Sequence, residues 1–339
     1  MIRRFDVAVL GADSMVGAAV LELLAERRFP VGEMSALVLD REEDATVEFA
    51  GTQLLLDDAS GFDFAQVQLA FLTGDDERYM ALAERAADAG CVVIDASGQA
   101  WRDLRVPRVV ANANAGALAG FNERGIVASP DRIVTVLLPV LDALHRSGGL
   151  VRVTATVLVP VSDAGRAGQE DLAGETMALL NARHYERRYF PQQIAFNLLG
   201  QVGGAGEDGS TERERRVASE LRELLNAPSL QVGVQLVHAA CFFGYAVAVE
   251  LELEQVPERT ALAEALRSTK GIELVENGDA ADCPSPVVDA TRSAVTRIAR
   301  LRPGCGPRTL ALWLTADNIR CAAALNAVAS AEILVRDYL

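Results

Sequence analysis

The feature that most constrains this chain is an apolar stretch near its start, followed at once by a glycine-rich turn. Residues 5–10 have the length and composition of a buried strand, and the turn Gly11-Ala-Asp-Ser-Met-Val-Gly17 comes directly after them. Residues 18–27 then carry apolar side chains at helical spacing. A strand, a glycine-rich turn and a helix in this order open a dinucleotide-binding unit. The sequence therefore predicts that the chain begins with a Rossmann-like domain.

Strands and helices continue to alternate in the residues that follow. Short apolar runs predict buried strands at 36–39, 69–73, 91–95, 109–111 and 125–128, and helical patterns cover 77–89 and 133–144. Alternation of this kind is typical of a parallel, doubly wound sheet.

The second half has a different pattern, in which strands follow one another with few helices between them. Apolar or alternating runs predict strands at 150–161, twice within 230–253, and at 271–275, 284–288, 295–299 and 309–315. Helices are predicted over 167–183, 212–225, 260–269 and 316–339. Runs of strands beside a few helices indicate an α+β domain with a mixed or antiparallel sheet. We therefore expect two domains, a Rossmann-like one of residues 1–130 with 316–339 and an α+β one of residues 131–315.

Composition argues against several classes of partner. The 339 residues include 32 Lys and Arg against 47 Asp and Glu, which gives a formal net charge of −15. A chain this acidic repels phosphate backbones and anionic lipid surfaces, so we expect no nucleic acid and no membrane among its partners. The sequence also has no apolar run of the ~18 residues that a membrane span needs. Five scattered cysteines without a CxxC pair predict a reduced, cytoplasmic protein with no metal site.

Taken in order, the whole chain resembles the aspartate-semialdehyde dehydrogenases. The most specific match is near the C-terminus, where Asp-Asn-Ile-Arg at 317–320 is followed by matches at 322–323 and 325–328. Other matching positions are Gly11, Ala12, Val16, Gly17, 29–33, 93–95, Ser97, Trp101, Arg102, 109–110, Asn114, Pro130, 164–165, 167–168 and His238. The resemblance implies a nucleotide-binding domain, a dimerisation domain with a mixed sheet, and a homodimer built through that sheet. It also implies that the C-terminal helix returns to pack on the nucleotide domain.

The resemblance implies a chemistry from which the chain departs at the central residue. In this family a Cys at a strand–turn–helix corner attacks the aldehyde, a His acts as acid and base, NADP accepts the hydride, and phosphate resolves the acyl-enzyme. Here the corner reads Ser129-Pro-Asp-Arg132, so Arg132 stands at the position of the nucleophile and cannot form a thioester. Other departures are Gln231 for the Arg that binds the substrate carboxylate, Val159 for a pocket Gln, Asn112 for a Glu and Cys321 for a Lys.

Some positions of the family's site are retained. His238 stands at the acid/base position, and Arg102 and Asn114 are kept, so these two and Gln231 are candidate contacts for a substrate or anion. Arg216 and Glu220 lie roughly where the family has a phosphate-binding Lys and a nearby Glu. Losses confined to the site of an otherwise retained scaffold are typical of a non-catalytic relative. The chain is most similar to the Usg-type branch of the family, which lacks the active-site Cys.

The glycine-rich turn has two interpretations. Its residues Gly11, Ala12, Ser14, Met15, Val16 and Gly17 are the candidates for cradling a cofactor pyrophosphate at a helix N-terminus. Alternatively, the glycines only permit a tight turn, because Ser14 replaces the middle glycine and Asp13 adds a negative charge. After the second strand, Asp40 and Arg41 are candidate contacts for the adenosine ribose. Asp40 would accept from a ribose 2′-hydroxyl and favour NAD over NADP, or else it belongs to a solvated acidic loop.

Arg132 and His238 are each open to two interpretations. Arg132 either binds an anion together with Arg102, or neutralises Asp131 or Asp95 at a helix start. His238 either contacts a ligand or is a hydrogen-bonded residue of the core. Cys241 is three residues further on, which in a strand would place it on the opposite face from His238.

Three functions are consistent with these residues. The first is a homodimeric, catalytically inactive relative that binds a small anionic metabolite or a protein partner. The second is an active NAD- or NADP-dependent oxidoreductase that uses His238 as acid and base without a covalent intermediate. The third is an accessory subunit of another enzyme.

Overall fold

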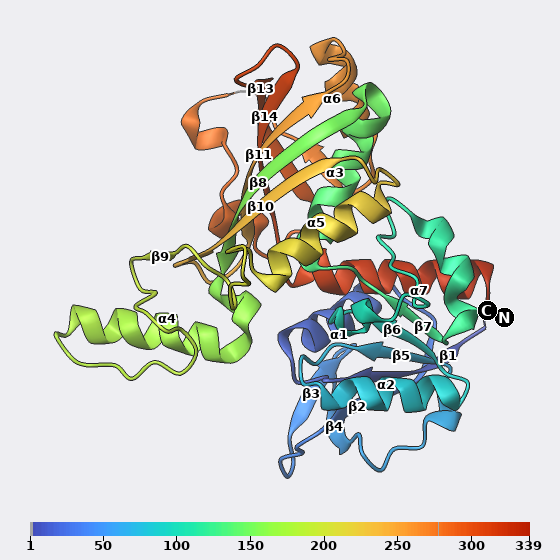
Figure 1. Ribbon diagram of the computed structural model, residues 1–339. Helices are drawn as coiled ribbons and strands as arrows, with labels where there is room; N and C mark the ends of the chain where they lie inside the picture. The colour runs from blue at the N-terminus through green and yellow to red at the C-terminus, as the bar shows by residue number, and fades with distance from the viewer. Residues whose placement is uncertain (1–2, 277) are drawn as a thin grey trace. The chain divides into compact units, whose positions relative to one another are not determined.

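The computed structural model describes residues 3–276 and 278–339. Residue contacts divide the chain into two compact units, Met1–Thr135 with Ala322–Leu339 as unit 1 and Val136–Cys321 as unit 2 (Figure 1). The chain first changes unit within a helix, and it returns just before its last regular helix.

Unit 1 is built on a seven-stranded sheet. Its strand order is β3-β4-β2-β1-β5-β6-β7. All neighbouring strands are parallel except the β3–β4 hairpin. The strands are β1 (Phe5–Leu10), β2 (Val31–Val38), β3 (Thr46–Phe49), β4 (Thr52–Asp58), β5 (Leu69–Leu72), β6 (Val92–Asp95) and β7 (Ile126–Ala128). The predicted Rossmann-like sheet is therefore confirmed.

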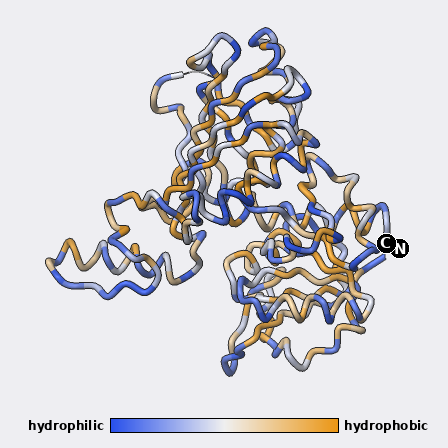
Figure 2. Tube along the Cα trace, in the orientation of Figure 1, coloured by the Kyte–Doolittle hydropathy of each residue, from blue (hydrophilic) through white to orange (hydrophobic). Residues whose placement is uncertain are grey.

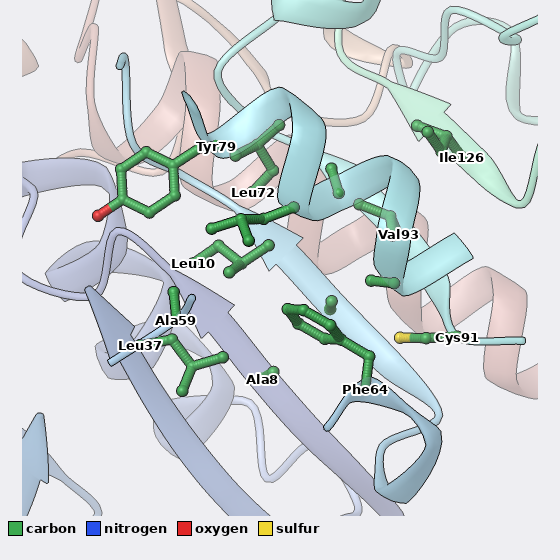
Figure 3. Packing of buried hydrophobic residues seen from close by; sticks show 14 of the residues in the cluster. Ala8, Leu10, Leu37, Ala59, Phe64, Leu72, Tyr79, Cys91, Val93 and Ile126 are labelled. Atoms are coloured by element: carbon green, nitrogen blue, oxygen red, sulfur yellow. The ribbon is translucent and has the colours of Figure 1, made fainter. Parts of the chain in front are cut away.

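Helices α1 (Met15–Glu26), α2 (Arg78–Asp88) and α7 (Asn326–Asp337) pack in this unit. The strands β1, β5 and β6 are almost wholly buried, which explains why they appear in the sequence as continuous apolar runs. Figure 3 shows part of the core, where Leu10, Leu72 and the ring of Tyr79 lie between the sheet and α2. In Figure 2 the apolar colour runs through the interior of each unit, and the hydrophilic colour is frequent in the outer loops.

The last helix belongs to the nucleotide unit, as the resemblance implied. Asn326 fixes its first turn, because its Oδ1 accepts from the amide of Ala111 at 2.9 Å. Its Nδ2 donates to the carbonyl of Val109 at 2.8 Å and to the hydroxyl of Ser129 at 3.0 Å. A single buried amide therefore ties the C-terminal segment to two loops more than 190 residues earlier.

Unit 2 contains a second, mixed sheet of seven strands in the order β12-β13-β14-β11-β8-β10-β9. The pairs β8–β10 and β12–β13 are parallel, and the other pairs are antiparallel. The strands are β8 (Leu150–Pro160), β9 (Leu198–Leu199), β10 (Gln231–Ala239), β11 (Tyr245–Leu253), β12 (Ile272–Leu274), β13 (Thr296–Pro303) and β14 (Thr309–Ala316). The helices are α3 (Arg132–Gly148), which begins in unit 1, α4 (Gly165–Leu180), α5 (Glu212–Leu224) and α6 (Arg259–Arg267). The predicted mixed α+β sheet is confirmed.

Helix α4 and the segment that follows it form an arm, defined here as residues 165–199, which extends away from the rest of the unit 2 sheet (Figure 1). Two buried carboxylates hold the arm together. Asp171 accepts from the backbone amides of residues 188–190 at 2.8 to 3.0 Å. Glu175 accepts from the amides of Ile194 and Ala195 at 2.8 and 3.0 Å. The irregular return segment is therefore fixed to the helix through its own backbone.

Three predicted elements are wrong. Residues 109–111 do not form a strand, because only Arg108 makes an isolated bridge to β7 and the carbonyl of Val110 already accepts from the amides of Ala113 and Asn114, which starts a turn. Residues 284–288 enter a wide helical turn, Pro286–Ala290, which the hydroxyl of Ser285 caps. The C-terminal helix does not begin at 316, because β14 extends to that residue and Asp317 then caps the turn through the amides of Ile319 and Arg320.

In the described ranges, no helix has the length and apolar character that crossing a membrane requires.

Candidate functional site

The first candidate site lies at the carboxyl ends of the parallel strands of unit 1. The sheet order reverses direction beside β1, with β2 on one side and β5 on the other. Ligands of doubly wound sheets bind in the crevice at such a switch point. Gly11 and Thr73 come directly after β1 and β5, and Asp40 is the second residue after β2.

Close packing explains the two outer glycines of the turn. Gly11 has a φ of +82°, and a Cβ on it would lie 2.5 Å from the amide nitrogen of Gly74. A Cβ on Gly17 would overlap the carbonyl oxygen of Gly11. Ala12 and Val16 are buried, so the part of the turn that reaches the surface is Asp13, Ser14 and Met15.

Ser14 caps helix α1. Its Oγ accepts from the amide of Gly17 at 2.9 Å and lies 3.2 Å from the carbonyl oxygen of Thr73, to which it donates. The twelve-residue helix thus begins at the switch point, where the N-terminal dipole favours an anionic group such as a pyrophosphate. The turn therefore fits a dinucleotide in its backbone shape, with a serine side chain at the position where a glycine is usual.

Asp40 and Arg41 follow the second strand and are both exposed. Arg78, the first residue of α2, lies 2.7 Å from Asp40 Oδ2 and 2.8 Å from Asp76 Oδ2 through its Nη2. The Arg78 guanidinium holds the pKa of the Asp40 carboxyl below its usual range, so this group is ionised at neutral pH. Arg41 lies 3.8 Å from Asp57, a weak surface pair.

The strand–turn–helix corner contains Arg132 as the first residue of α3. Its side chain is only 11% exposed, and its Nη2 lies 3.4 Å from the carboxylate of Asp75. Asp95, one of the two expected partners, is instead used within its own loop, where it accepts from Ser97, Gly98 and Ala100. The pairing of Arg132 with Asp95 was therefore a wrong expectation, because Asp95 is saturated by local donors.

Two other predicted residues of unit 1 have local contacts. The guanidinium of Arg102 lies 4.7 Å from the centre of the ring of its neighbour Trp101. Asn114 is half-buried, and its Nδ2 donates to the carbonyl of Arg108 at 2.9 Å while its Oδ1 accepts from Val110 at 2.7 Å. Asn114 therefore stabilises the loop before β7.

The second candidate site lies in unit 2 around His238. This residue is on β10 opposite Leu199 of β9 and is 6% exposed. Its ring centre lies 5.0 Å from the ring centre of Phe190, in an edge-to-face arrangement. It lines a cavity of about 430 Å³ whose other walls are residues of the 189–203 segment. Burial lowers the pKa of His238, so the imidazole is neutral at pH 7. Within residues 3–276 and 278–339, its Nδ1 has no hydrogen-bond partner.

The other residues of unit 2 that the sequence singled out lie on different elements and differ in their contacts. Gln231 is exposed at the first residue of β10, seven residues before the histidine. Arg216 lies on α5 and pairs with the buried Glu220 at 2.9 Å, one helical turn further on. Cys241 lies beyond the end of β10, so strand alternation does not determine its direction.

A partly buried ionic cluster in unit 2 was not predicted. The carboxylate of Asp163 accepts from the guanidinium of Arg213 and from the hydroxyl of Tyr245, and Arg213 Nη2 lies 3.3 Å from the same hydroxyl. Asp163 and Arg213 both act electrostatically on His238, in opposite directions. No motif or spacing links Asp163, Arg213 and Tyr245 in the sequence, because each comes from a different segment.

None of the cysteine thiols with a shifted pKa has the lowered value that an activated nucleophile needs. Burial raises the pKa of the Cys91 and Cys321 thiols to about 12 and also raises that of Cys241. A hydrogen bond to Glu250 raises the pKa of exposed Cys305. Reactive cysteines require the opposite shift. In the part of the chain that the structure describes, no group of three or more His, Cys, Asp or Glu could hold a metal ion.

Comparison with known proteins places these sites in a family. Residues 6–121 match the model of the semialdehyde dehydrogenase NAD binding domain, and residues 141–321 match that of the semialdehyde dehydrogenase dimerisation domain. The chain belongs to the semialdehyde dehydrogenase family. Within it, the chain is 37% identical over 339 residues to aspartate-semialdehyde dehydrogenase 2 of Vibrio cholerae, with all of both chains covered. It is 38% identical over 332 residues to a USG-1 protein homolog of Azotobacter vinelandii, with 98% of each covered.

Solved structures of the semialdehyde dehydrogenase family agree with this fold. The crystal structure of aspartate semialdehyde dehydrogenase II from Vibrio cholerae aligns with a TM-score of 0.95 at 36% identity, covering 99% of this chain and 100% of that one. The structure of a probable aspartate-semialdehyde dehydrogenase from Pseudomonas aeruginosa aligns with a TM-score of 0.93 at 38% identity, with the same coverage. The match to the two family models thus assigns the first domain as an NAD binding domain and the second as a dimerisation domain.

Proposed function

We propose that this protein is a catalytically inactive member of the semialdehyde dehydrogenase family, which binds a nicotinamide dinucleotide but does not oxidise a semialdehyde through an acyl-enzyme. The observation that carries this proposal is Arg132 at the first residue of α3, where the family resemblance places the nucleophilic Cys. A guanidinium stays protonated at all physiological pH values and offers no lone pair for attack on an aldehyde.

The remaining cysteines do not compensate for this loss. A replacement nucleophile needs a thiol whose pKa is lowered, since only the thiolate attacks. The shifts of Cys91, Cys241, Cys305 and Cys321 are all upward. These four thiols therefore do not supply the activated nucleophile that the thioester route requires.

The protein would act as a binding protein in the form of a homodimer. Support for nucleotide binding comes from the turn at the N-terminus of α1, and support for the dimer comes from the matched dimerisation domain. We further infer a cytoplasmic location from the free cysteines and the absence of a CxxC pair in the sequence. Arg102 and the corner around Arg132 are the candidate contacts for a small anionic metabolite.

The decisive experiment follows the covalent step directly. The pure protein is incubated with aspartate semialdehyde, phosphate and either NAD or NADP, while reduced cofactor is measured by absorbance and the intact protein by mass spectrometry. We expect no phosphate-dependent reduction of the cofactor and no acyl adduct. Phosphate-dependent turnover that disappears in His238→Ala would contradict the proposal, because a contaminating enzyme would not respond to that substitution.

A second function is favoured by one observation, the neutral state of His238. A histidine whose pKa is lowered by burial is a proton acceptor at pH 7, as hydride transfer from an alcohol requires. The protein would then be an oxidoreductase without a covalent intermediate. Reduction of NAD by any member of a panel of hydroxy acids, lost in His238→Ala, would support this function over the first.

A further inference from the structure

The start of α2 in unit 1 takes part in an ionic arrangement that lies outside the glycine-rich turn. Arg78 uses its Nη1 and Nη2 on the two oxygens of Asp40, at 3.4 and 2.7 Å. Its Nε lies 3.1 Å from both carboxylate oxygens of Asp76, and its Nη2 lies 2.8 Å from Asp76 Oδ2. One guanidinium is thus held between two carboxylates, and its positive charge is neutralised by them.

The backbone beside Asp40 is also fixed. The hydroxyl of Tyr79, the residue after Arg78, accepts from the amide of Leu39 at 3.2 Å. The ring of Tyr79 lies against Gly74, where any Cβ would overlap the ring. The start of α2 therefore holds both the main chain before Asp40 and its carboxylate, through two consecutive residues.

The position of Asp40 matches a known requirement of dinucleotide binding. In βαβ units the acidic residue that accepts from the adenosine ribose follows the second strand, about 20 residues after the glycine-rich turn. Asp40 follows β2 and comes 40 − 17 = 23 residues after Gly17. Its side chain is 77% exposed, so its oxygens remain accessible beside the ion pair.

We propose that Asp40, positioned by Arg78, selects NAD and excludes NADP, although the family resemblance implies NADP. This inference rests on the proposed binding of a nicotinamide dinucleotide. An ionised carboxylate accepts from a ribose 2′-hydroxyl and repels a 2′-phosphate. Arg78 does not compensate, because its charge is already shared by two carboxylates. Arg41, which follows Asp40, lies 3.8 Å from the carboxylate of Asp57. Asp13, in the loop after β1, adds further negative charge to the same edge of the sheet.

Four variants and the native protein test the inference by calorimetric titration with NAD and with NADP. We expect the native protein to bind NAD at least about tenfold more tightly than NADP. Asp40→Ala weakens NAD and strengthens NADP, because it removes the repulsion and releases Arg78 for the 2′-phosphate. The double substitution Asp40→Ala with Arg78→Ala loses that gain for NADP. Arg78→Ala alone weakens NAD several-fold and leaves NADP weak, since the carboxylate remains but is no longer held.

The matched control is Asp337→Ala. This residue pairs with Arg336 at 2.7 Å near the C-terminus of α7, so its removal changes the net charge equally. We expect it to leave the ratio of the two affinities unchanged. Equal or tighter binding of NADP by the native protein, or equal effects of Asp40→Ala and Asp337→Ala, would overturn the inference, as would binding of neither nucleotide. None of these results bears on the missing acyl-enzyme, which the mass measurement above tests separately.

Discussion

At the scale of single residues, His238 carries a testable consequence for stability. Its pKa is lowered mainly by burial, so the folded state binds a proton less readily than the unfolded state, whose histidine has a pKa near 6.5. Stability is then complete above that value and falls as the pH drops below it, because the unfolded state takes up the proton first. We expect the free energy of unfolding, measured with urea, to fall between pH 7.5 and pH 5.5. The fall should be larger for the native protein than for His238→Gln.

The exposed His184 provides the control for this measurement. His184→Gln should retain the pH dependence of the native protein, since it removes a histidine that lies outside the core. If His238→Gln and the native protein had parallel profiles, the histidine would not be buried in its neutral form.

At the scale of secondary structure elements, Asp171 determines whether the arm keeps its shape. Replacing it with Ala leaves the amides of residues 188–190 without their acceptor, and Phe190 among them is buried. Each unsatisfied buried group costs about 1–3 kcal/mol, so we expect Asp171→Ala to lower the free energy of unfolding by at least about 2 kcal/mol. Limited proteolysis should then cut within 183–199 first. Glu170→Ala, which removes only an exposed pair with Arg188, should do neither.

At the scale of the whole molecule, we expect the arm to contribute to the contact between two copies of the chain, in addition to the sheet through which the resemblance implies that the dimer forms. Large exposed apolar side chains are concentrated there, namely Met177, Leu179, Leu180, Tyr189, Phe196 and Leu198. All of them fall within the matched dimerisation domain. We expect the native protein to sediment as a dimer and the double substitution Met177→Asp with Leu180→Asp to sediment as a monomer. Leu104→Asp, at a leucine of unit 1 that is 83% exposed, should remain dimeric, and a dimeric double variant would contradict this assignment.

The sequence by itself determined the class of fold and the absence of a nucleophile at the corner. Both depend on local information: buried parallel strands appear as continuous apolar runs, a Rossmann-like turn needs Gly11 and Gly17, and Arg132 cannot act as a Cys whatever surrounds it. The same local reasoning failed at 109–111 and 284–288, because a short apolar run is equally compatible with an irregular segment, which is buried at Val109 and Val110 and exposed at Val287 and Val288.

Only the tertiary structure decided which charges meet. Asp40 and Arg78 are 38 residues apart, and Asp163 and Arg213 are 50 apart, so no periodicity or motif connects them. Arg132 pairs with Asp75 and not with Asp95, since both carboxylate oxygens of Asp95 accept from amides and a hydroxyl of the loop after β6. Pairing of this kind depends on which loops the sheet order brings to one edge, and that is a property of the folded chain.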